Sequence, residues 1–519
     1  MSDNRNSFWQ VLFGRTSIFI TLVAIQVFAV IGGVAILGTK VLIANHAIGV
    51  LAVLIIVYLL NTSMNSSFKL MWIILIIATP IIGVPFYFYT RVQPGTKFIA
   101  KRVDTIIKEQ EEYLLPDLES VRSLADEYPS ELGIFKYLYE KGNYPIYRNT
   151  AVKYFPSGED KFHEMLIQLK RAKKFIFLEY FIIGKGYMWD SILEILEAKA
   201  QEGVEVRVMY DGTCMMSLLP FNYPDKLKKK GIKCKVFSPM KPFLSTHQNN
   251  RDHRKILVID GHTAFTGGVN LADEYINEYE RFGHWKDTAI MLKGEAVDSF
   301  TLMFLQMWNI SSKQPENYLK YIKQVQPLVL ESNDIYPGGY IAPYGDSPLD
   351  TEEVGKRMYI DILNRAKDYV HIMTPYLIID EEMVNALTFA AERGVDVRII
   401  MPHIPDKKYA YFLARTYYEE LIKRGVKIYE YTPGFVHAKV FVSDDEKAVV
   451  GTINLDFRSL FLHFECATYI YRNPVVLDIE TDYLKTLERC HRITLRDCKD
   501  YPKINKVAGK ALKLIAPLM

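Results

Sequence analysis

The first part of the chain carries three long runs of apolar side chains. They occupy about residues 17–38, 41–60 and 70–89, and each is long enough to cross the hydrocarbon core of a bilayer. Tyrosine and tryptophan side chains lie near the ends of these runs, as they do at membrane interfaces. We therefore expect residues 1–95 to form a membrane region of transmembrane helices. A two-span arrangement with one re-entrant segment is the alternative.

Basic residues are divided unequally between the two sides of this region. With three spans, three lysine and arginine residues fall on the N-terminal side, and five fall on the side of the remaining chain. Because basic residues favour the cytoplasmic side, we expect a multi-pass protein of the cell membrane whose larger part is cytoplasmic.

Beyond the membrane region, the hydrophobic pattern changes from long runs to short elements. Residues 96–160 are rich in charged side chains and predict a helical connector. From residue 161, apolar strands alternate with helices that end in glycine, and the same order of elements occurs twice. The predicted strands are Phe175–Ile183, Val204–Tyr210 and Lys233–Phe237 in the first series, and Tyr369–Ile379, Val395–Met401 and Val426–Tyr431 in the second.

This repetition predicts an α/β protein with two copies of one unit. We place the copies at 161–345 and 346–485, each an α/β sandwich with helices on both faces of its sheet, and we expect a pseudo-two-fold axis to relate them. The tail, residues 486–519, has lysines at steps of three and four that predict the basic face of an amphipathic helix. Such a helix can lie on anionic lipid, and an ordinary solvated helix face is the competing interpretation.

One short motif, H-x-K-x-x-x-x-D, occurs once in each copy, and in both an asparagine follows ten residues after the aspartate. Its residues are His253, Lys255, Asp260 and Asn270 and, 184 positions later, His437, Lys439, Asp444 and Asn454. A single match of this kind is weak evidence, but two matches with identical spacing are much harder to obtain by accident.

Two histidines and two lysines can together cleave a phosphodiester without a metal or another cofactor. One imidazole can attack phosphorus, while the other protonates the leaving alkoxide and then deprotonates an incoming alcohol. The lysines can neutralise the charge that develops on the phosphate oxygens, and Asn270 and Asn454 can donate hydrogen bonds to these oxygens. For Asp260 and Asp444 we weigh a direct catalytic contact against a structural role in the turn behind each motif.

The residues around both motifs resemble the bacterial cardiolipin synthases of the phospholipase D superfamily. The strings that carry the resemblance are NNRDHRKILVIDGHTAFTGGVNLADEY, RGVDVRIIMPHIPDKKYAYFLARTYYEELIKRGVKIYEY and PGFVHAKVFVSDDEKAVVGTINLDFRSLFLHFE. The resemblance implies two phospholipase D-like repeats and transfer of a phosphatidyl group from one phosphatidylglycerol to another, giving cardiolipin and glycerol through a phosphohistidine. It implies His253 as the nucleophile and His437 as the acid and base, with the opposite assignment open.

A glutamate that orients a motif histidine also recurs in the superfamily. Glu465 stands 28 residues after His437 and fits this role. The equivalent position after the first motif is Arg281, which cannot accept a hydrogen bond from an imidazole, so Glu280 and Asp287 are the candidates there. The superfamily often has a serine two residues before the motif asparagine, where this chain has a glycine in the first copy and a threonine in the second.

Composition bears on the alternatives that remain. A net charge of only +3 argues against a nuclease and against nucleic acid as a partner. A membrane-bound hydrolase stays open, since water could take the place of the acceptor alcohol. Phosphatidylethanolamine could also replace one phosphatidylglycerol. A non-catalytic scaffold is the third hypothesis, against which both intact motifs argue. We expect phosphatidylglycerol and cardiolipin in the bilayer as partners, and a homo-oligomer is left open.

Overall fold

The computed structural model describes Phe28 and residues 42–91, 94–239, 249–312, 316–324 and 333–518. Of the predicted apolar run at 17–38, all but Phe28 lies outside the described residues.

The first repeat is built on a sheet with the strand order β10–β1–β9–β7–β6–β2–β3–β4. Its strands are β1 (Thr150–Phe155), β2 (Phe175–Tyr180), β3 (Glu205–Asp211), β4 (Lys233–Phe237), β6 (Lys255–Ile259), β7 (Thr263–Gly267), β9 (Ala289–Gly294) and β10 (Tyr336–Pro337). The helices are α9 (Gly158–Arg171), α10 (Tyr187–Gln201), α11 (Cys214–Ser217), α12 (Tyr223–Lys229) and α13 (Val297–Asn309). Strand β1 precedes residue 161, so this sheet takes in part of the expected connector.

The second repeat has the strand order β11–β20–β18–β17–β12–β14–β15–β21. Its strands are β11 (Tyr340–Asp346), β12 (Tyr369–Met373), β14 (Asp396–Pro402), β15 (Lys427–Tyr431), β17 (Val440–Ser443), β18 (Lys447–Gly451), β20 (His463–Tyr471) and β21 (Cys490–Arg492). The helices are α14 (Val354–Arg365), α15 (Glu381–Glu392), α16 (Lys408–Lys423), α17 (Phe457–Phe461) and α18 (Val475–Leu487). From β1 to β4 and from β11 to β15 the two orders correspond strand for strand, which confirms the predicted duplication.

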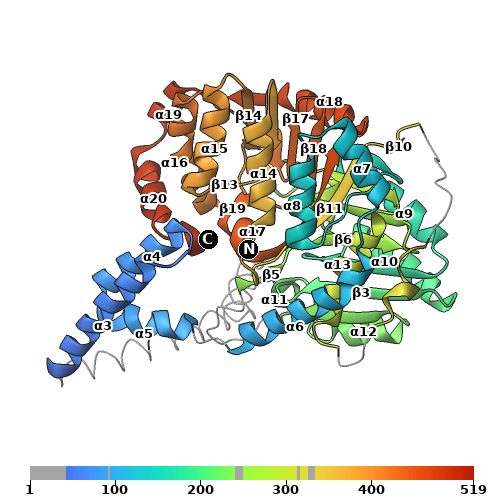
Figure 1. Ribbon diagram of the computed structural model, residues 1–519, viewed down its shortest axis with the longest axis horizontal. Helices are drawn as coiled ribbons and strands as arrows, with labels where there is room; N and C mark the ends of the chain where they lie inside the picture. The colour runs from blue at the N-terminus through green and yellow to red at the C-terminus, as the bar shows by residue number, and fades with distance from the viewer. Residues whose placement is uncertain are drawn as a thin grey trace, which may run out of the picture.

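The two sheets share one layer of apolar side chains, and Figure 1 shows how their strands and helices are arranged. Phe175 and Phe177 of β2 point into this layer, together with side chains of α13, α18 and the second sheet. Ile176 and Leu178 point to the opposite face, where α9 and α10 cover the sheet. Helices α14, α15 and α16 cover the outer face of the second sheet in the same way. The central strands are thus buried on both faces, which explains the continuous apolar runs in the sequence, whereas the edge strands β4, β10 and β21 are partly exposed.

The N-terminal apolar region forms α3 (Leu42–Leu60), α4 (Ser66–Ala78) and α5 (Pro80–Arg91). The expected single span at 70–89 is therefore wrong, because the chain breaks at Thr79, next to a proline that cannot donate a hydrogen bond inside a helix. Helix α5 packs back on α4, with the Trp72 and Tyr87 ring centres 5.3 Å apart. Among the residues that are described, no helix has both the length and the apolar character needed to cross a membrane.

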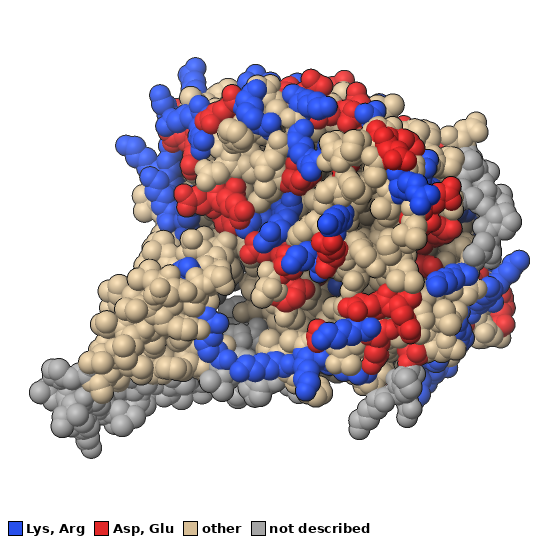
Figure 2. Space-filling model, viewed as in Figure 1, with Lys and Arg blue, Asp and Glu red and all other residues tan. Residues whose placement is uncertain are grey.

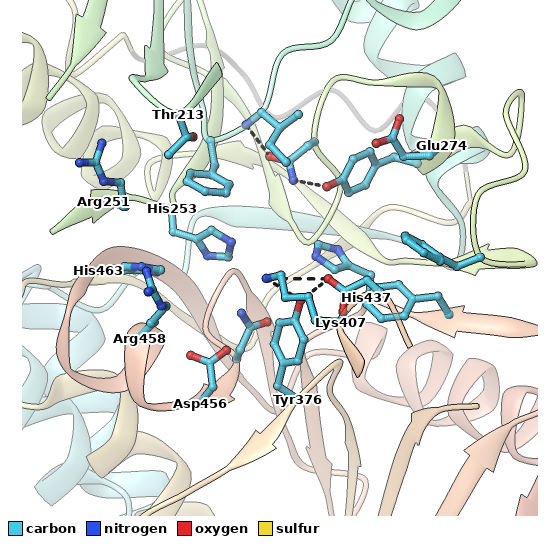
Figure 3. A pocket seen from close by; sticks show the side chains of 18 of the residues that line it. Thr213, Arg251, His253, Glu274, Tyr376, Lys407, His437, Asp456, Arg458 and His463 are labelled. Carbon is cyan, nitrogen blue, oxygen red and sulfur yellow. Dashed lines mark hydrogen bonds and ion pairs between the residues drawn. The ribbon is translucent and has the colours of Figure 1, made fainter. Parts of the chain in front are cut away.

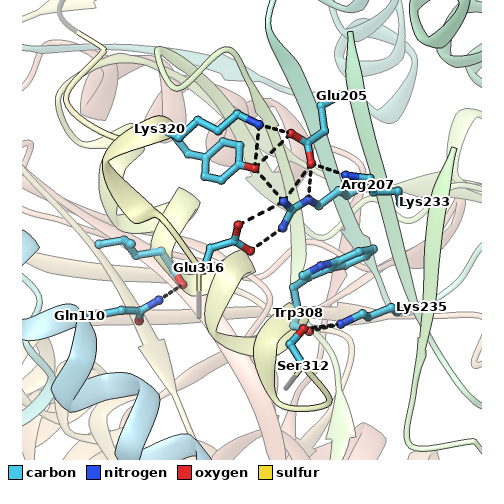
Figure 4. Close-up of polar contacts among 11 residues, drawn as sticks. Gln110, Glu205, Arg207, Lys233, Lys235, Trp308, Ser312, Glu316 and Lys320 are labelled. Atoms are coloured by element: carbon cyan, nitrogen blue, oxygen red, sulfur yellow. Dashed lines mark hydrogen bonds and ion pairs between the residues drawn. The ribbon is translucent and has the colours of Figure 1, made fainter. Parts of the chain in front are cut away.

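The remaining elements connect this region to the repeats and close the chain. The connector contains α6 (Pro94–Gln110), α7 (Leu118–Glu127) and α8 (Leu132–Gly142), and the tail contains α19 (Leu495–Asp500) and α20 (Lys503–Lys513). Gln110 at the end of α6 donates a hydrogen bond to the Leu302 carbonyl in α13 at 3.1 Å, so the connector is fixed to the first repeat (Figure 4).

Candidate active site

Each repeat lends a short strand to the other immediately before its motif histidine. The four strands involved are β5 (Arg251–Asp252) paired with β20, and β16 (Gly434–Val436) paired with β8 (His284–Lys286). The pairing continues into the motifs, since the His253 amide donates to the Phe464 carbonyl at 2.9 Å and the His437 amide to the Lys286 carbonyl at 2.7 Å. The backbone therefore carries both histidines to the junction of the repeats.

At this junction, both motif histidines line one cavity of about 840 Å³ (Figure 3). Its wall contains residues of both repeats, including Asn270 and Tyr275 from the first and Tyr376 and Asn454 from the second. The two halves of the duplicated motif thus form a single site.

Each motif histidine is held by a buried carboxylate. The Nδ1 atom of His253 lies 2.9 Å from both carboxylate oxygens of Glu465, and Nδ1 of His437 lies 2.7 Å from Oδ2 of Asp287. Burial lowers the pKa of His253 to about 3 and that of His437 to about 4. Although burial alone would raise the pKa of each carboxyl group, the adjacent imidazole holds it below its usual range. Both rings are therefore neutral, donate Nδ1–H to a carboxylate, and keep the Nε2 lone pair for a substrate.

The two motif lysines are buried, are not among the residues that line the cavity, and each contacts the backbone of its own motif histidine. Lys255 Nζ donates to the carbonyl oxygen of His253 at 2.7 Å, and Lys439 Nζ donates to that of His437. Burial lowers the pKa of Lys255 to about 8 and that of Lys439 to about 7. An anion that enters between them would favour their charged forms, so the pair is suited to a phosphate group.

The two motif asparagines differ in what they contact. Asn270 accepts the Ile182 amide at 3.0 Å and donates to the Tyr275 hydroxyl at 2.8 Å, so its amide is engaged by the protein. Asn454 also lines the cavity, and its Oδ1 is buried without a hydrogen-bond partner in the described part of the chain. Because Oδ1 is an acceptor, a hydrogen bond from Asn454 to a phosphate oxygen would have to come from its Nδ2 atom.

The motif aspartates lie outside the cavity. Asp260 accepts the backbone amides of Lys173, Lys174 and Phe175 at 2.7–2.8 Å, and Asp444 accepts three equivalent amides before β12 at 2.9–3.0 Å. The motif strand extends about 3.3 Å per residue, which places Asp260 about 16 Å from Lys255. The geometry corrects their expected place among the catalytic residues and favours the structural alternative.

Replacing Asp260 with alanine should therefore affect the free energy of unfolding more than the catalytic rate. Three amides lose their acceptor, which costs about 2–4 kcal/mol of unfolding free energy if they stay partly buried. Activity per folded molecule should change by less than about fivefold, and Asp444→Ala should behave alike. Urea unfolding together with active-site titration separates the two effects. A well-folded Asp260→Ala protein without activity would return the residue to the chemistry.

Glu465 contacts a motif histidine, but the one in the other repeat. The offset of 28 residues suggested His437, whereas the structure pairs Glu465 with His253 and gives Asp287 to His437. The residues at the two positions where the superfamily often has serine each lie against one of these carboxylates. The Thr452 hydroxyl donates to Glu465, while a methyl group at Gly268 would lie 2.0 Å from Asp287 Oδ1. Glycine is required there because the carboxylate of Asp287 fills the space.

His463 is a third buried histidine in the cavity, and sequence reasoning missed it. It is 8% exposed, and within the described residues neither ring nitrogen has a hydrogen-bond partner. Its ring centre lies 5.5 Å from that of His253 (Figure 3). It stands two residues before Glu465 in a strand, and this spacing, which places both on one face, was the available signal. The ligand atoms of His253, His463 and Glu465 lie within 4.8 Å of one another, so these three could hold a cation.

Further polar side chains that sequence reasoning missed line the cavity from both repeats. The Tyr376 hydroxyl donates to Asp406 at 2.6 Å and accepts from Lys407 at 3.3 Å. Arg251 and Arg458 line the same cavity. The site thus offers cationic groups in addition to the motif lysines.

Comparisons with known proteins agree with this geometry. Residues 165–308 and 359–487 match the family described as "Cardiolipin synthase, PLD-like domain", and residues 50–91 match the one described as "Phospholipase_D-nuclease N-terminal". A cardiolipin synthase of Alkalihalophilus pseudofirmus is 34% identical, covering 87% of this chain and 88% of its own. One of Halalkalibacterium halodurans is 33% identical, covering 90% and 91%.

Two further relatives extend the comparison. A Streptococcus mutans protein described as uncharacterized is 53% identical and covers 89% of this chain and 99% of its own. The crystal structure of a phosphatidylserine synthase from Haemophilus influenzae superposes with a TM-score of 0.55 at 15% identity, covering 71% of this chain and 95% of that one. This last likeness concerns the fold.

Proposed function

The chain belongs to the phospholipase D-like cardiolipin synthases and is a phosphatidyltransferase, and from this we propose that it transfers the phosphatidyl group of one phosphatidylglycerol to a second, releasing glycerol. The observation that carries the proposal is the pair of neutral imidazoles, one from each repeat, in one cavity. Each has its Nδ1 fixed by a carboxylate and its Nε2 available. Such a pair provides a nucleophile and an acid–base group on one phosphodiester.

In the first step, His253 Nε2 attacks the phosphorus of the donor lipid. The bond from phosphorus to the glycerol oxygen breaks, and the imidazolium of His437 gives its proton to that oxygen. The bound phosphodiester anion supports protonation of His437, since it offsets the positive charge of the motif lysines. Lys255 and Lys439 stabilise the charge that develops on the non-bridging oxygens. The products are free glycerol and a phosphatidyl group on His253.

In the second step, the neutral His437 removes a proton from the terminal hydroxyl of the second phosphatidylglycerol. The resulting oxygen attacks phosphorus, the bond to His253 breaks, and cardiolipin forms. The second lipid carries a phosphate of its own, and the cationic side chains of Arg251, Lys407 and Arg458 in the same cavity suit it. A volume of about 840 Å³ fits the polar ends of two lipids.

The N-terminal helices support a place at the cell membrane, as we expected from the sequence. Val53, Leu54 and Ile77 are each at least 60% exposed, and Figure 2 shows the surface of α3–α5 almost without charge. A contiguous apolar surface of this kind needs a partner other than water. We propose that it lies in the bilayer, with the repeats on the cytoplasmic face.

The pKa values of the motif side chains predict an unusual pH profile. Because Lys439 and Lys255 have pKa values of about 7 and 8, kcat/KM should fall as pH rises through this range and the lysines lose their charge. His253, the attacking base, is neutral down to about pH 3, so no acid limb should appear near 6.5. His437 must gain a proton to act as the acid, so kcat/KM should already decline above about pH 4, and the loss of lysine charge should steepen that decline. Rates measured in uncharged detergent micelles test this profile. Lys439→Arg should shift the alkaline limb upward, and an unshifted limb would contradict the assignment.

The function itself is tested by product analysis. Purified protein in liposomes of phosphatidylglycerol, with EDTA present, should give cardiolipin and glycerol in equal amounts by mass spectrometry. The EDTA arm tests the expectation that no metal takes part. Phosphatidic acid as the main product would assign the protein to the hydrolases instead. Cardiolipin formed only when phosphatidylethanolamine is added would change the donor.

A further inference from the structure

A second cavity, of about 480 Å³, lies between α4 and α20 beside the second repeat. Its lining is largely apolar, with Ile74 from α4, Val384 from α15 and Phe457 from α17, and it also contains Lys510 and Lys513 of α20. We propose that this cavity binds one anionic glycerophospholipid from the bilayer, separately from the catalytic cavity. The inference rests on the proposed function in one respect: the enzyme works at a bilayer.

The walls of this cavity are fixed by packing against the second repeat. Asn65 at the start of α4 donates a hydrogen bond to Asp380 at 2.8 Å. The Phe68 ring makes T-shaped contacts with two phenylalanine rings of α17, with ring centres 5.7 and 5.8 Å apart. On the other side, Gly509 of α20 lies so close to α16 that an added methyl group would be 2.4 Å from the Phe412 carbonyl oxygen. Both helices are therefore held at a set separation, and the space between them is part of the fold.

The surface on both sides of the cavity is apolar and exposed. Leu70 and Ile77 of α4 are 56% and 66% exposed, and Val507 and Leu514 at the α20 end are 67% and 54% exposed. These side chains would face the acyl region of a membrane that the N-terminal helices enter. The cavity thus opens where lipid chains are available.

Charge is arranged to hold the polar end of such a lipid. Helix α20 carries Lys503, Lys506, Lys510 and Lys513, and Figure 2 shows this basic cluster directly beside the uncharged surface of α3–α5. Lys513 Nζ lies 4.2 Å from the ring centre of Tyr417, which holds it over the cavity. Glu381 of α15 also lines the cavity and repels a phosphate there, whereas Glu420 lies near Tyr417 and so on the side of Lys513, where the lysines outnumber it. The headgroup is therefore directed to the α20 side, with the acyl chains against the apolar lining.

Helix α17 separates this cavity from the catalytic one. Phe457 lines the lipid cavity, whereas its neighbours Asp456 and Arg458 line the catalytic cavity. A lipid bound here therefore packs against the helix that presents Arg458 to the substrate.

The test measures lipid binding to the delipidated full-length protein in uncharged detergent by native mass spectrometry. The probe is dioleoyl phosphatidic acid, which has no headgroup alcohol to lose and so cannot act as a phosphatidyl donor. The double variant Lys510→Gln with Lys513→Gln should raise the Kd of the tightest site by about tenfold or more, because each lysine is expected to contribute about fivefold to the affinity. The matched pair Lys503→Gln and Lys506→Gln makes the same charge change on the same helix outside this cavity, and should weaken binding by about twofold at most.

A third variant, Ile74→Trp, fills the apolar part without changing charge and should also weaken binding. Equal losses from both lysine pairs would show diffuse adsorption and overturn the proposal, as would no loss from any variant. Equally tight binding of dioleoyl phosphatidylcholine, or of water-soluble glycerol phosphate, would overturn the choice of an anionic lipid. None of these readouts needs turnover. A chain that binds phosphatidic acid through Lys510 and Lys513 but makes no cardiolipin would refute the proposed function alone.

Discussion

Replacing His253 or His437 with alanine should lower cardiolipin formation by about four orders of magnitude or more. Loss of His253 removes the group that attacks phosphorus, and loss of His437 leaves the glycerol oxygen without a proton donor and the acceptor without a base. Because the two act on one phosphodiester, the double variant should be little worse than either single one. Initial rates of cardiolipin formation, corrected for folded protein, measure this effect.

His371 provides a matched control for this substitution. It is a buried histidine of the second repeat whose Nδ1 lies 2.9 Å from Glu480, but it lies outside the catalytic cavity. His371→Ala should destabilise the fold and keep the rate per folded molecule within about threefold. Loss of activity from His371→Ala equal to that from His253→Ala would mean that damage to the fold explains both.

Replacing Glu465 with glutamine should reduce kcat by about a thousandfold with little change in KM. The glutamine amide can donate to His253 Nδ1, which moves the ring proton to Nε2 and removes the lone pair that attacks phosphorus. Asp287→Asn should act on His437 in the same way. The measurement is steady-state kinetics with phosphatidylglycerol in mixed micelles, together with thermal unfolding.

The control for this pair is Glu480→Gln, which makes the same change at the buried pair with His371. It should leave kcat within about twofold. If Glu465→Gln retains most of its kcat, the carboxylate only fills space, and the cross-repeat pairing has no part in the chemistry.

The repeat architecture could be predicted because its signals are local. Strand alternation and helix-ending glycines recur in the same order in both halves, and β2, β4 and β15 lie where the pattern indicated, shortened by a few residues at most. The motif histidines and lysines could also be predicted, since their residue types and spacing carry the chemistry. Their meeting at one cavity followed from the duplication.

The partners of the histidines could not be predicted, because they depend on contacts between repeats. An offset along the chain assigned Glu465 to His437, but β5 pairs with β20 of the other repeat and brings Glu465 to His253. Spacing along the chain cannot show that a carboxylate of one repeat contacts the histidine of the other. Asp260 shows the opposite difficulty: it is close to Lys255 in sequence, yet an extended strand takes it to the far end of the sheet.

The N-terminal region shows how a hydrophobic run can mislead about helix length. Apolar content alone suggested one helix over 70–89, whereas Pro80 starts a new helix that packs back on α4. Pro80 was visible in the sequence, and a break before it was the better expectation, whereas Pro85 lies inside α5 and does not end it.

The central claim is that a phosphatidyl group is carried on His253, and trapping it is the most direct test. A phosphatidyl ester of p-nitrophenol, given without an acceptor lipid and quenched in alkali, should release one nitrophenolate per site and leave one phosphatidyl group on His253. The His437→Ala variant should still form this adduct, since nitrophenolate leaves without a proton, and His253→Ala should form none. An adduct on His437, or cardiolipin made by an enzyme that never forms an adduct, would contradict the account.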